Sequence, residues 1–253
     1  MKTLKALLLP AILLLAWEIA MHVKNVQSDS LAAPSQIAIA FKDAMLDGTI
    51  LSRTAETLRA ALLGLALGGG SALILSIILG LVPPVARLLQ FTIEVLRPVP
   101  SVALIPVAIL TLGFGYGMEI SLVAFSTFWP ILIYGHAAIT NIDEQMLDLA
   151  KVLRLKTFAR ITKIILPATL PRYFVAFRLA TAVSLIIAVT VEIAANPLGI
   201  GYELMQASQS LHPDLTFALV LWIGLVGWTL NTLLLFAQRR LFGPAGVAFG
   251  IQQ

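Results

Sequence analysis

The sequence contains no cysteine and little charge. Only 12% of its 253 residues are Asp, Glu, Lys or Arg, about half the share of a soluble domain, whereas 59% are hydrophobic. Without cysteine, disulfides, thiolate nucleophiles and cysteine metal sites are excluded. The histidines His22, His136 and His212 are too scattered to have metal-ligand spacing. We therefore predict an all-α integral membrane protein with no catalytic residue and no metal site.

Long apolar runs predict about six membrane-spanning helices, because a spanning helix needs about 20 apolar residues. Segments 60–82, 120–139 and 215–237 contain no formally charged residue. Segment 173–195 carries Arg178 and Glu192 near its ends. Segment 85–112 is broken by three prolines and holds Glu94 and Arg97.

The sixth predicted span is the first in the chain, residues 3–22. Two lysines precede a short apolar run there, and the small residues SLAAPS follow at 30–35, which together also fit a cleavable signal peptide. Glu18 lies where such a peptide stays apolar, so a retained span is the favoured reading.

Lysine and arginine are distributed unequally between the two sides of the membrane. With the N-terminus inside, the predicted cytoplasmic stretches hold 12 of the 17 basic residues. Positive charge is retained on the cytoplasmic side, so we predict cytoplasmic N- and C-termini. Residues 1–59 then form the first span and an external connection, 60–240 the transmembrane domain, and 241–253 a cytoplasmic tail. A surface helix beginning at Pro34 and a short helix within 196–214 are expected outside, and Pro213 is expected to start the last span.

The internal loop 142–172 collects much of the charge. We predict that Asn141 caps a first helix starting at residue 142, and that a second helix, 158–166, is stopped by Pro167 and Pro171. Met146, Leu149, Ala150 and Leu153 fall on one helical face. Two such short helices cannot form a core, so this face needs a partner. The alternative is a loop lying on lipid headgroups.

The spacing of this loop resembles the signature loop of permease subunits of ABC importers: Glu-Ala-Ala, three residues, Gly, nine residues, then Ile-x-Leu-Pro. The chain has DLA at 148–150, Arg154, and IILP at 164–167. Arg154 replaces the Gly, at a turn that can require positive φ. LRPVPSVALIPVAILTLGFG (96–115) and FRLATAVSLIIAVTVEIAANPLGIGYELMQAS (177–208) are similar to the nitrate/sulfonate/taurine branch of these permeases. The resemblance covers residues 50 to 240.

The resemblance implies a type I importer permease of the bacterial inner membrane. It implies a homodimer, two ABC ATPase subunits that dock on the cytoplasmic two-helix coupling loop, and a periplasmic substrate-binding protein. ATP and magnesium are expected in the partner ATPase, with no cofactor in this chain, because the sequence has no Gly-x-x-x-x-Gly-Lys-Ser/Thr. The expected ATPase-coupling residues are Asp143, Met146, Asp148, Leu149, Ala150, Leu153, Arg154, Ile164, Leu166 and Pro167.

Four residues are candidates for the translocation pathway: Glu192, Arg97, Ser184 and Thr190. Ionisable groups inside a membrane usually face a cavity or a partner. Each candidate has a structural alternative: a hydrogen bond near the surface for Glu192, an ion pair with Glu94 for Arg97, and bonds to helix carbonyls for Ser184 and Thr190.

The sequence does not identify the substrate. The resemblance implies a small anion such as a sulfonate, taurine or nitrate, and related permeases carry aromatic acids or pyrimidine precursors. An ion-coupled secondary transporter is the rival class, and it predicts inverted repeats, of which the sequence has none.

Overall fold

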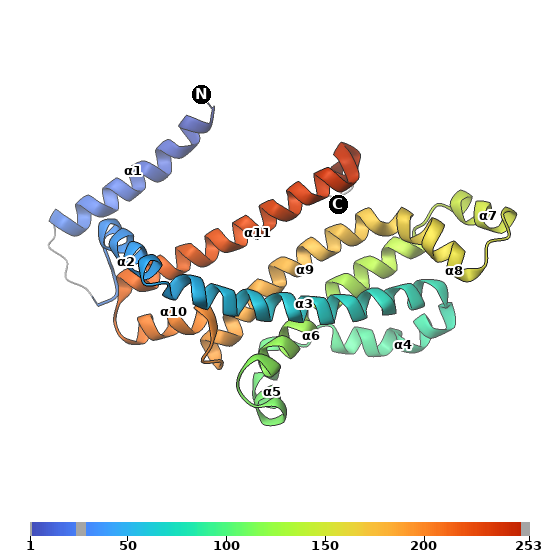
Figure 1. Cartoon of the computed structure of the whole chain (residues 1–253), viewed down its shortest axis with the longest axis horizontal. Coiled ribbons are helices and arrows are strands. Elements are labelled where there is room, and N and C mark those ends of the chain that lie inside the picture. Colours follow the sequence, from blue (N-terminus) through green and yellow to red (C-terminus); the bar gives the residue numbers. More distant parts are fainter. Residues whose placement is uncertain (1, 24–28, 249–253) are drawn as a thin grey trace.

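The chain folds as a bundle of long helices in the computed structural model, which describes residues 2–23 and 29–248 (Figure 1). Residues 24–28 of the predicted connection and 249–253 of the predicted tail lie outside the described residues. The elements are α1 (Lys2–Val23), α2 (Pro34–Leu46), α3 (Thr49–Leu81), α4 (Pro83–Leu96), the 3₁₀ helix η1 (Ser101–Leu104), α5 (Ile105–Leu112), α6 (Tyr116–Thr140), α7 (Glu144–Val152), α8 (Thr157–Arg160), the π-helix η2 (Ile161–Ile165), α9 (Leu166–Ala194), α10 (Gly199–Gln209) and α11 (Pro213–Ala248).

The predicted all-α membrane class is confirmed. Within the described residues, four helices are long and apolar enough to cross a membrane, and the bent pair α4 and η1–α5 makes up to five. The predicted first span coincides with α1, whose apolar stretch Leu8–Val23 is shorter than the other candidates. Its crossing of the membrane stays a prediction.

Helices α3, α6 and α9 form the centre of the bundle, and glycines let them approach closely. A Cβ on Gly68 would overlap the Ala124 carbonyl oxygen of α6, and a Cβ on Gly64 would lie 2.5 Å from Val123. Farther along, the hydroxyls of Ser76 and Tyr173 hydrogen-bond at 2.6 Å in the buried core. Small residues at helix contacts are the usual means of membrane helix packing.

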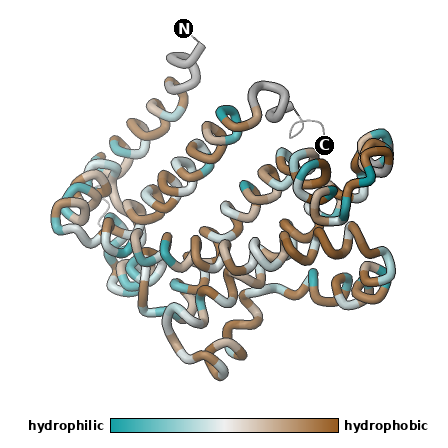
Figure 2. The backbone as a smooth tube through the Cα atoms, turned by 45° about the vertical axis from the view of Figure 1, so that its right-hand side comes forward, coloured by the Kyte–Doolittle hydropathy of each residue, from teal (hydrophilic) through white to brown (hydrophobic). Residues whose placement is uncertain are grey.

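Short helices lie at opposite ends of the bundle. Figure 1 shows α7 and α8 beside the end of α3 and the start of α4, whereas α2 and α10 lie at the other end. In Figure 2 brown hydrophobic colour dominates the long helices, and teal is more frequent on the short ones. The predicted starts of α2 at Pro34 and of α11 at Pro213 are confirmed, and α11 continues through residues 241–248 of the predicted tail.

Candidate functional site

The loop between α6 and α9 begins with a capped helix. The Asp143 carboxylate accepts a hydrogen bond at 3.0 Å from the N–H of Gln145, the second residue of α7. The prediction that Asn141 caps a helix from residue 142 was wrong, because Asn141 ends α6 and its N–H is bonded to the Ala137 carbonyl. Asp143 is suited to the cap because a carboxylate also interacts favourably with the helix dipole.

The end of α7 has an arginine where helices usually place glycine. Arg154 has φ of 46°, in the left-handed region, and the Leu155 N–H donates to the Ala150 carbonyl at 3.1 Å. This six-residue bond around a left-handed residue is the Schellman motif. The positive φ anticipated for this turn is therefore present, although the residue is not glycine.

We expect Arg154→Gly to stabilise the loop by about 1 kcal/mol, because a left-handed conformation costs a non-glycine residue about 1–2 kcal/mol. Chymotrypsin cleavage in detergent at the apolar residues around the turn should slow roughly fivefold, since native-state proteolysis follows the open population. Arg154→Ala is the control, because it removes the same side chain and keeps the strain. Equal cleavage rates for the two variants would contradict the role of φ.

Apolar side chains of the loop remain exposed. We define the docking face as five residues of α7, the turn and α8, whose side chains are 49% to 79% exposed: Met146, Leu149, Val152, Leu153 and Phe158. Val152 and Phe158 were missed from the sequence, although a simple count of apolar residues in the loop includes them. Because exposed apolar groups of this size mark interaction surfaces, the face is available to a partner.

Other predicted coupling residues hold the loop on the bundle. Ala150 was expected on the exposed face, and this was wrong: it is 2% exposed, on an α7 that contacts η2. A small side chain permits that close approach of the two helices. Ile164 is 9% exposed, and the neighbouring Ile165 packs with Ile139 and Tyr173. Asp148 and Pro167 are exposed and Leu166 is half-buried.

The second loop helix does not stop at the prolines. Helical structure runs from Thr157 to Ala194 through Pro167 and Pro171, so the predicted stop was wrong. The π-helix η2 precedes Pro167, and the Leu166 N–H bonds the Ile161 carbonyl one residue farther back than in an α-helix. Such a bulge shifts the hydrogen-bond register just before the proline. Proline otherwise breaks a helix, because it has no backbone N–H and its ring clashes with the preceding turn.

The break in the predicted third span is a sharp elbow. The axes of α4 and of the η1–α5 segment differ by 83° around Arg97 to Pro100. A cavity of about 580 Å³ lies against this elbow, and its walls come from the elbow, α6 and α9. The predicted ion pair between Glu94 and Arg97 is absent from the described part of the chain, where Glu94 accepts a hydrogen bond from Gln90 instead.

The polar residues predicted for the pathway on α9 do not gather in one place. Ser184 is 1% exposed and donates to the Thr181 carbonyl at 2.8 Å. Thr190 donates to Ile186 and lines a separate cavity of about 430 Å³ between α9 and α11. Glu192 lines neither this cavity nor the one at the elbow. Both hydroxyls therefore make the bonds to helix carbonyls that the sequence left as the alternative.

Glu192 is buried inside the subunit with a second carboxyl group. Glu192 and Glu119 are 1% and 0% exposed, and they lie close enough to interact. The side-chain amide of Asn196 donates to Glu119 at 2.6 Å. Glu119 was missed because the predicted span 120–139 begins at the next residue. A carboxylate directly before an apolar span was the signal that could have indicated it. This burial favours the structural alternative for Glu192.

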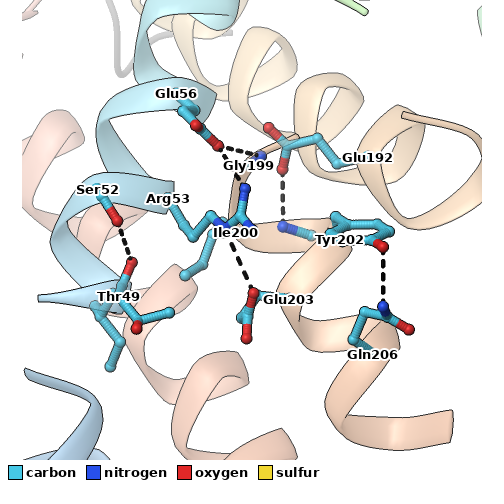
Figure 3. A network of polar contacts seen from close by, with 12 residues as sticks. Thr49, Ser52, Arg53, Glu56, Glu192, Gly199, Ile200, Tyr202, Glu203 and Gln206 are labelled. Atoms are coloured by element: carbon cyan, nitrogen blue, oxygen red, sulfur yellow. Dashed lines mark hydrogen bonds and ion pairs between the residues drawn. The ribbon is translucent and has the colours of Figure 1, made fainter. Parts of the chain in front are cut away.

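Side chains of α3 and α9 bind the first N–H groups of α10. Glu56 accepts from the Gly199 N–H at 2.9 Å, Thr57 from the N–H of residue 200 at 2.9 Å, and Glu192 from the Gly201 N–H at 2.8 Å. Figure 3 shows Glu56 and Glu192 directed at this helix end. We call these three contacts the α10 anchor. Free N–H groups and the helix dipole make this end attractive to carboxylates.

A second layer of charge supports the α10 anchor. Arg53 donates to Glu56 at 3.1 Å and lies 3.4 Å from Glu203 of α10 (Figure 3). Both pairs are partly exposed, so each contributes little by itself. In the described residues no three His, Cys, Asp or Glu side chains lie together as a metal site requires.

The chain is similar to known transport proteins over most of its length. Residues 72–242 match the family model described as binding-protein-dependent transport system inner membrane component. A protein of Bacillus subtilis named aliphatic sulfonates transport permease protein SsuC is 30% identical, over 94% of this chain and 86% of its own length. The protein of the same name in Escherichia coli is 32% identical, over 87% of this chain and 83% of its own length. The nitrate import permease protein NrtB of Leptolyngbya laminosa is 29% identical, over 73% and 63%.

Solved structures of ABC transporters share the fold. A structure of the MetNI methionine ABC transporter in inward-facing conformations matches 73% of this chain and 94% of its own chain, with 15% identity and a TM-score of 0.61. An amino acid ABC transporter matches 78% and 97%, with 16% identity and a TM-score of 0.64. These findings support the transporter permease over the ion-coupled secondary transporter.

Proposed function

Because the chain belongs to the family of binding-protein-dependent transport system inner membrane components, we propose that it imports a small organic or inorganic anion such as a sulfonate, taurine or nitrate. It is a permease subunit and not an enzyme, and a separate ATPase hydrolyses ATP. The proposed substrate class, an anion, is inferred from the sulfonate and nitrate permeases among the relatives of this chain. The chain's own support for an anion is the lone Arg97 on the wall of the elbow cavity.

The docking face is the proposed contact for the ATPase. It combines exposed apolar side chains with a loop that Ile165 fixes to the ends of α6 and α9. A rigidly attached apolar face can transmit a displacement of its partner to the spans, whereas a mobile loop cannot. Asp143 and Arg154 shape the two ends of α7, and exposed Asp148 can assist orientation at the rim.

The assembly follows the family pattern in this proposal. Two copies of the permease form a homodimer, each with an ATPase that binds ATP and magnesium, and a periplasmic binding protein delivers the anion. The protein lies in the bacterial inner membrane with cytoplasmic termini. The position of α2 and α10 at the end of the bundle opposite α7 and α8 supports separate surfaces for the binding protein and the ATPase (Figure 1).

Reconstituted transport tests the proposed function. The permease, its ATPase and its binding protein are placed in vesicles, and uptake of labelled ethanesulfonate, taurine and nitrate is measured against methionine as a zwitterionic control without a sulfonate or nitrate group. We expect ATP-dependent uptake of at least one of the anions, and loss of uptake when any one component is omitted. Uptake of methionine alone, or uptake driven by an ion gradient without ATP, would refute the proposal.

A further inference from the structure

The elbow cavity is an open hollow beside the bent pair α4 and η1–α5, with α6 and α9 as its other walls. Its 580 Å³ exceed the volume of a small solute, and its walls combine aromatic and aliphatic side chains with a few polar groups. Binding sites for small molecules have this composition. Irregular backbone at membrane depth, such as the Arg97 to Pro100 break, is tolerated only where protein or water covers it.

Arg97 is the single charged residue among those that line the cavity. Its guanidinium makes no ion pair or hydrogen bond with any described residue, and the neighbouring Glu94 accepts a hydrogen bond from Gln90 instead. No carboxylate lines the cavity. The residues that line the cavity therefore carry one positive charge and no negative charge.

The depth of Arg97 makes an unpaired charge costly. α4 has 14 residues, which at 1.5 Å per residue place Arg97 about 21 Å from the helix start. The hydrocarbon core is about 30 Å thick, so an α4 crossing it steeply carries the guanidinium well inside. Charged groups at that depth normally face a partner or a water-filled path and mark solute or ion pathways.

The remaining walls fit an anion with a short apolar tail. Ser101 and Tyr134 line the cavity, and their hydroxyls make no hydrogen bond with the described residues, so each is free to donate to a solute. Phe125 and Trp129 supply aromatic surface, with ring centroids 5.6 Å apart. A guanidinium binds planar or tetrahedral oxyanions through two parallel N–H donors.

We propose that the elbow cavity is an anion subsite of the transport path, in which Arg97 binds the sulfonate or nitrate group and the aromatic wall receives the carbon chain of a sulfonate. The inference rests on the proposed function for the identity of the solute. The same chemistry suits a lipid phosphate, and the experiment separates these two sources.

The absence of cysteine provides the test. Ile133→Cys places one thiol on the cavity wall. Purified protein is reacted with 2-sulfonatoethyl methanethiosulfonate, which is itself an alkyl sulfonate, and with its trimethylammonium analogue. Arg97 should favour the anionic reagent, so Arg97→Gln should lower the ratio of anionic to cationic reaction rates about tenfold, as expected for a charge a few ångströms away. Arg97→Lys should retain most of the ratio.

Arg87→Gln is the matched control, because Arg87 lies on the same helix and does not line the cavity. Its ratio should equal that of the Ile133→Cys parent. An equal ratio in the Arg97→Gln and Arg87→Gln proteins would overturn the proposal.

Lipid and solute are separated by repeating the reaction in phosphatidylcholine vesicles with and without phosphatidylglycerol. Ethanesulfonate should slow the anionic reagent in both vesicles, as a solute subsite requires. Suppression by phosphatidylglycerol with no competition by ethanesulfonate would assign Arg97 to a lipid phosphate and refute the solute subsite. The proposed function is tested by a separate measurement. If ATP-dependent uptake is missing while the cavity still prefers the anionic reagent, the proposed function fails and the subsite does not.

Discussion

Leu149→Asp should detach the ATPase from the permease. Leu149 belongs to the docking face and is 52% exposed, so the substitution changes a contact surface and leaves the core intact. Binding energy in interfaces is concentrated in a few apolar anchors. A carboxylate forced into an apolar groove should weaken binding by about 2 kcal/mol or more, roughly 30-fold. Co-purification of the ATPase in lipid-free detergent measures the loss.

Lys156→Ala is the control for this prediction. Lys156 is an exposed charge between α7 and α8, with no side-chain cap bond, and its removal should have a small effect. If the loop instead lies on lipid headgroups, the ranking reverses: Lys156→Ala weakens membrane contact and Leu149→Asp retains the ATPase. Ala150→Asp cannot make the distinction, because Ala150 is buried and a carboxylate there would disrupt the loop itself.

Gly201→Ala should release α10 from the bundle. A Cβ at Gly201 would lie 2.5 Å from the Val189 carbonyl oxygen and 2.8 Å from the Glu192 Cβ. The helix start must then move away from α9, and the hydrogen bond from the Gly201 N–H to buried Glu192 is lost. Overpacking and an unpaired buried carboxylate each cost about 1–3 kcal/mol. We expect the free energy of unfolding to fall by about 3 kcal/mol in total, which lowers the thermal unfolding midpoint by roughly 6–12 °C.

Gly70→Ala is the matched control, because nothing lies within 4 Å of the added Cβ in α3. It should leave the midpoint unchanged or raise it slightly, since alanine favours helix over glycine. The midpoints are compared by thermal unfolding in one detergent. Equal midpoints for Gly201→Ala and Gly70→Ala would show that the α10 anchor does not hold the helix.

Sequence reasoning located the elements at the α2 and α10 end of the fold but missed the hydrogen bonds between them. Pro34 and Pro213 begin α2 and α11 as predicted, because proline at a helix start loses no hydrogen bond. Glu192 was recognised as an unusual intramembrane carboxylate. The partners of Glu192 could not be read from the sequence. Glu119 lies 73 positions before it, and the Gly201 N–H whose hydrogen bond it accepts belongs to the start of α10.

By itself, the sequence determined that this is a helical membrane protein and which segments form its long helices, because apolar length and proline position act locally. The spacing of the 148–167 loop determined its likeness to importer permeases. Only the tertiary structure decided that Ala150 is buried while Leu149 is exposed, that Glu94 leaves Arg97 without an ion pair, and that helix continues through Pro167. The burial of Ala150 depends on which helices meet in space, and contacts between distant segments have no periodic signal in the chain. Glu94 has two possible partners within one helical turn, Gln90 and Arg97, and the sequence does not choose between them. The helix passes Pro167 because a π-helical hydrogen bond precedes it, which no residue pattern indicates.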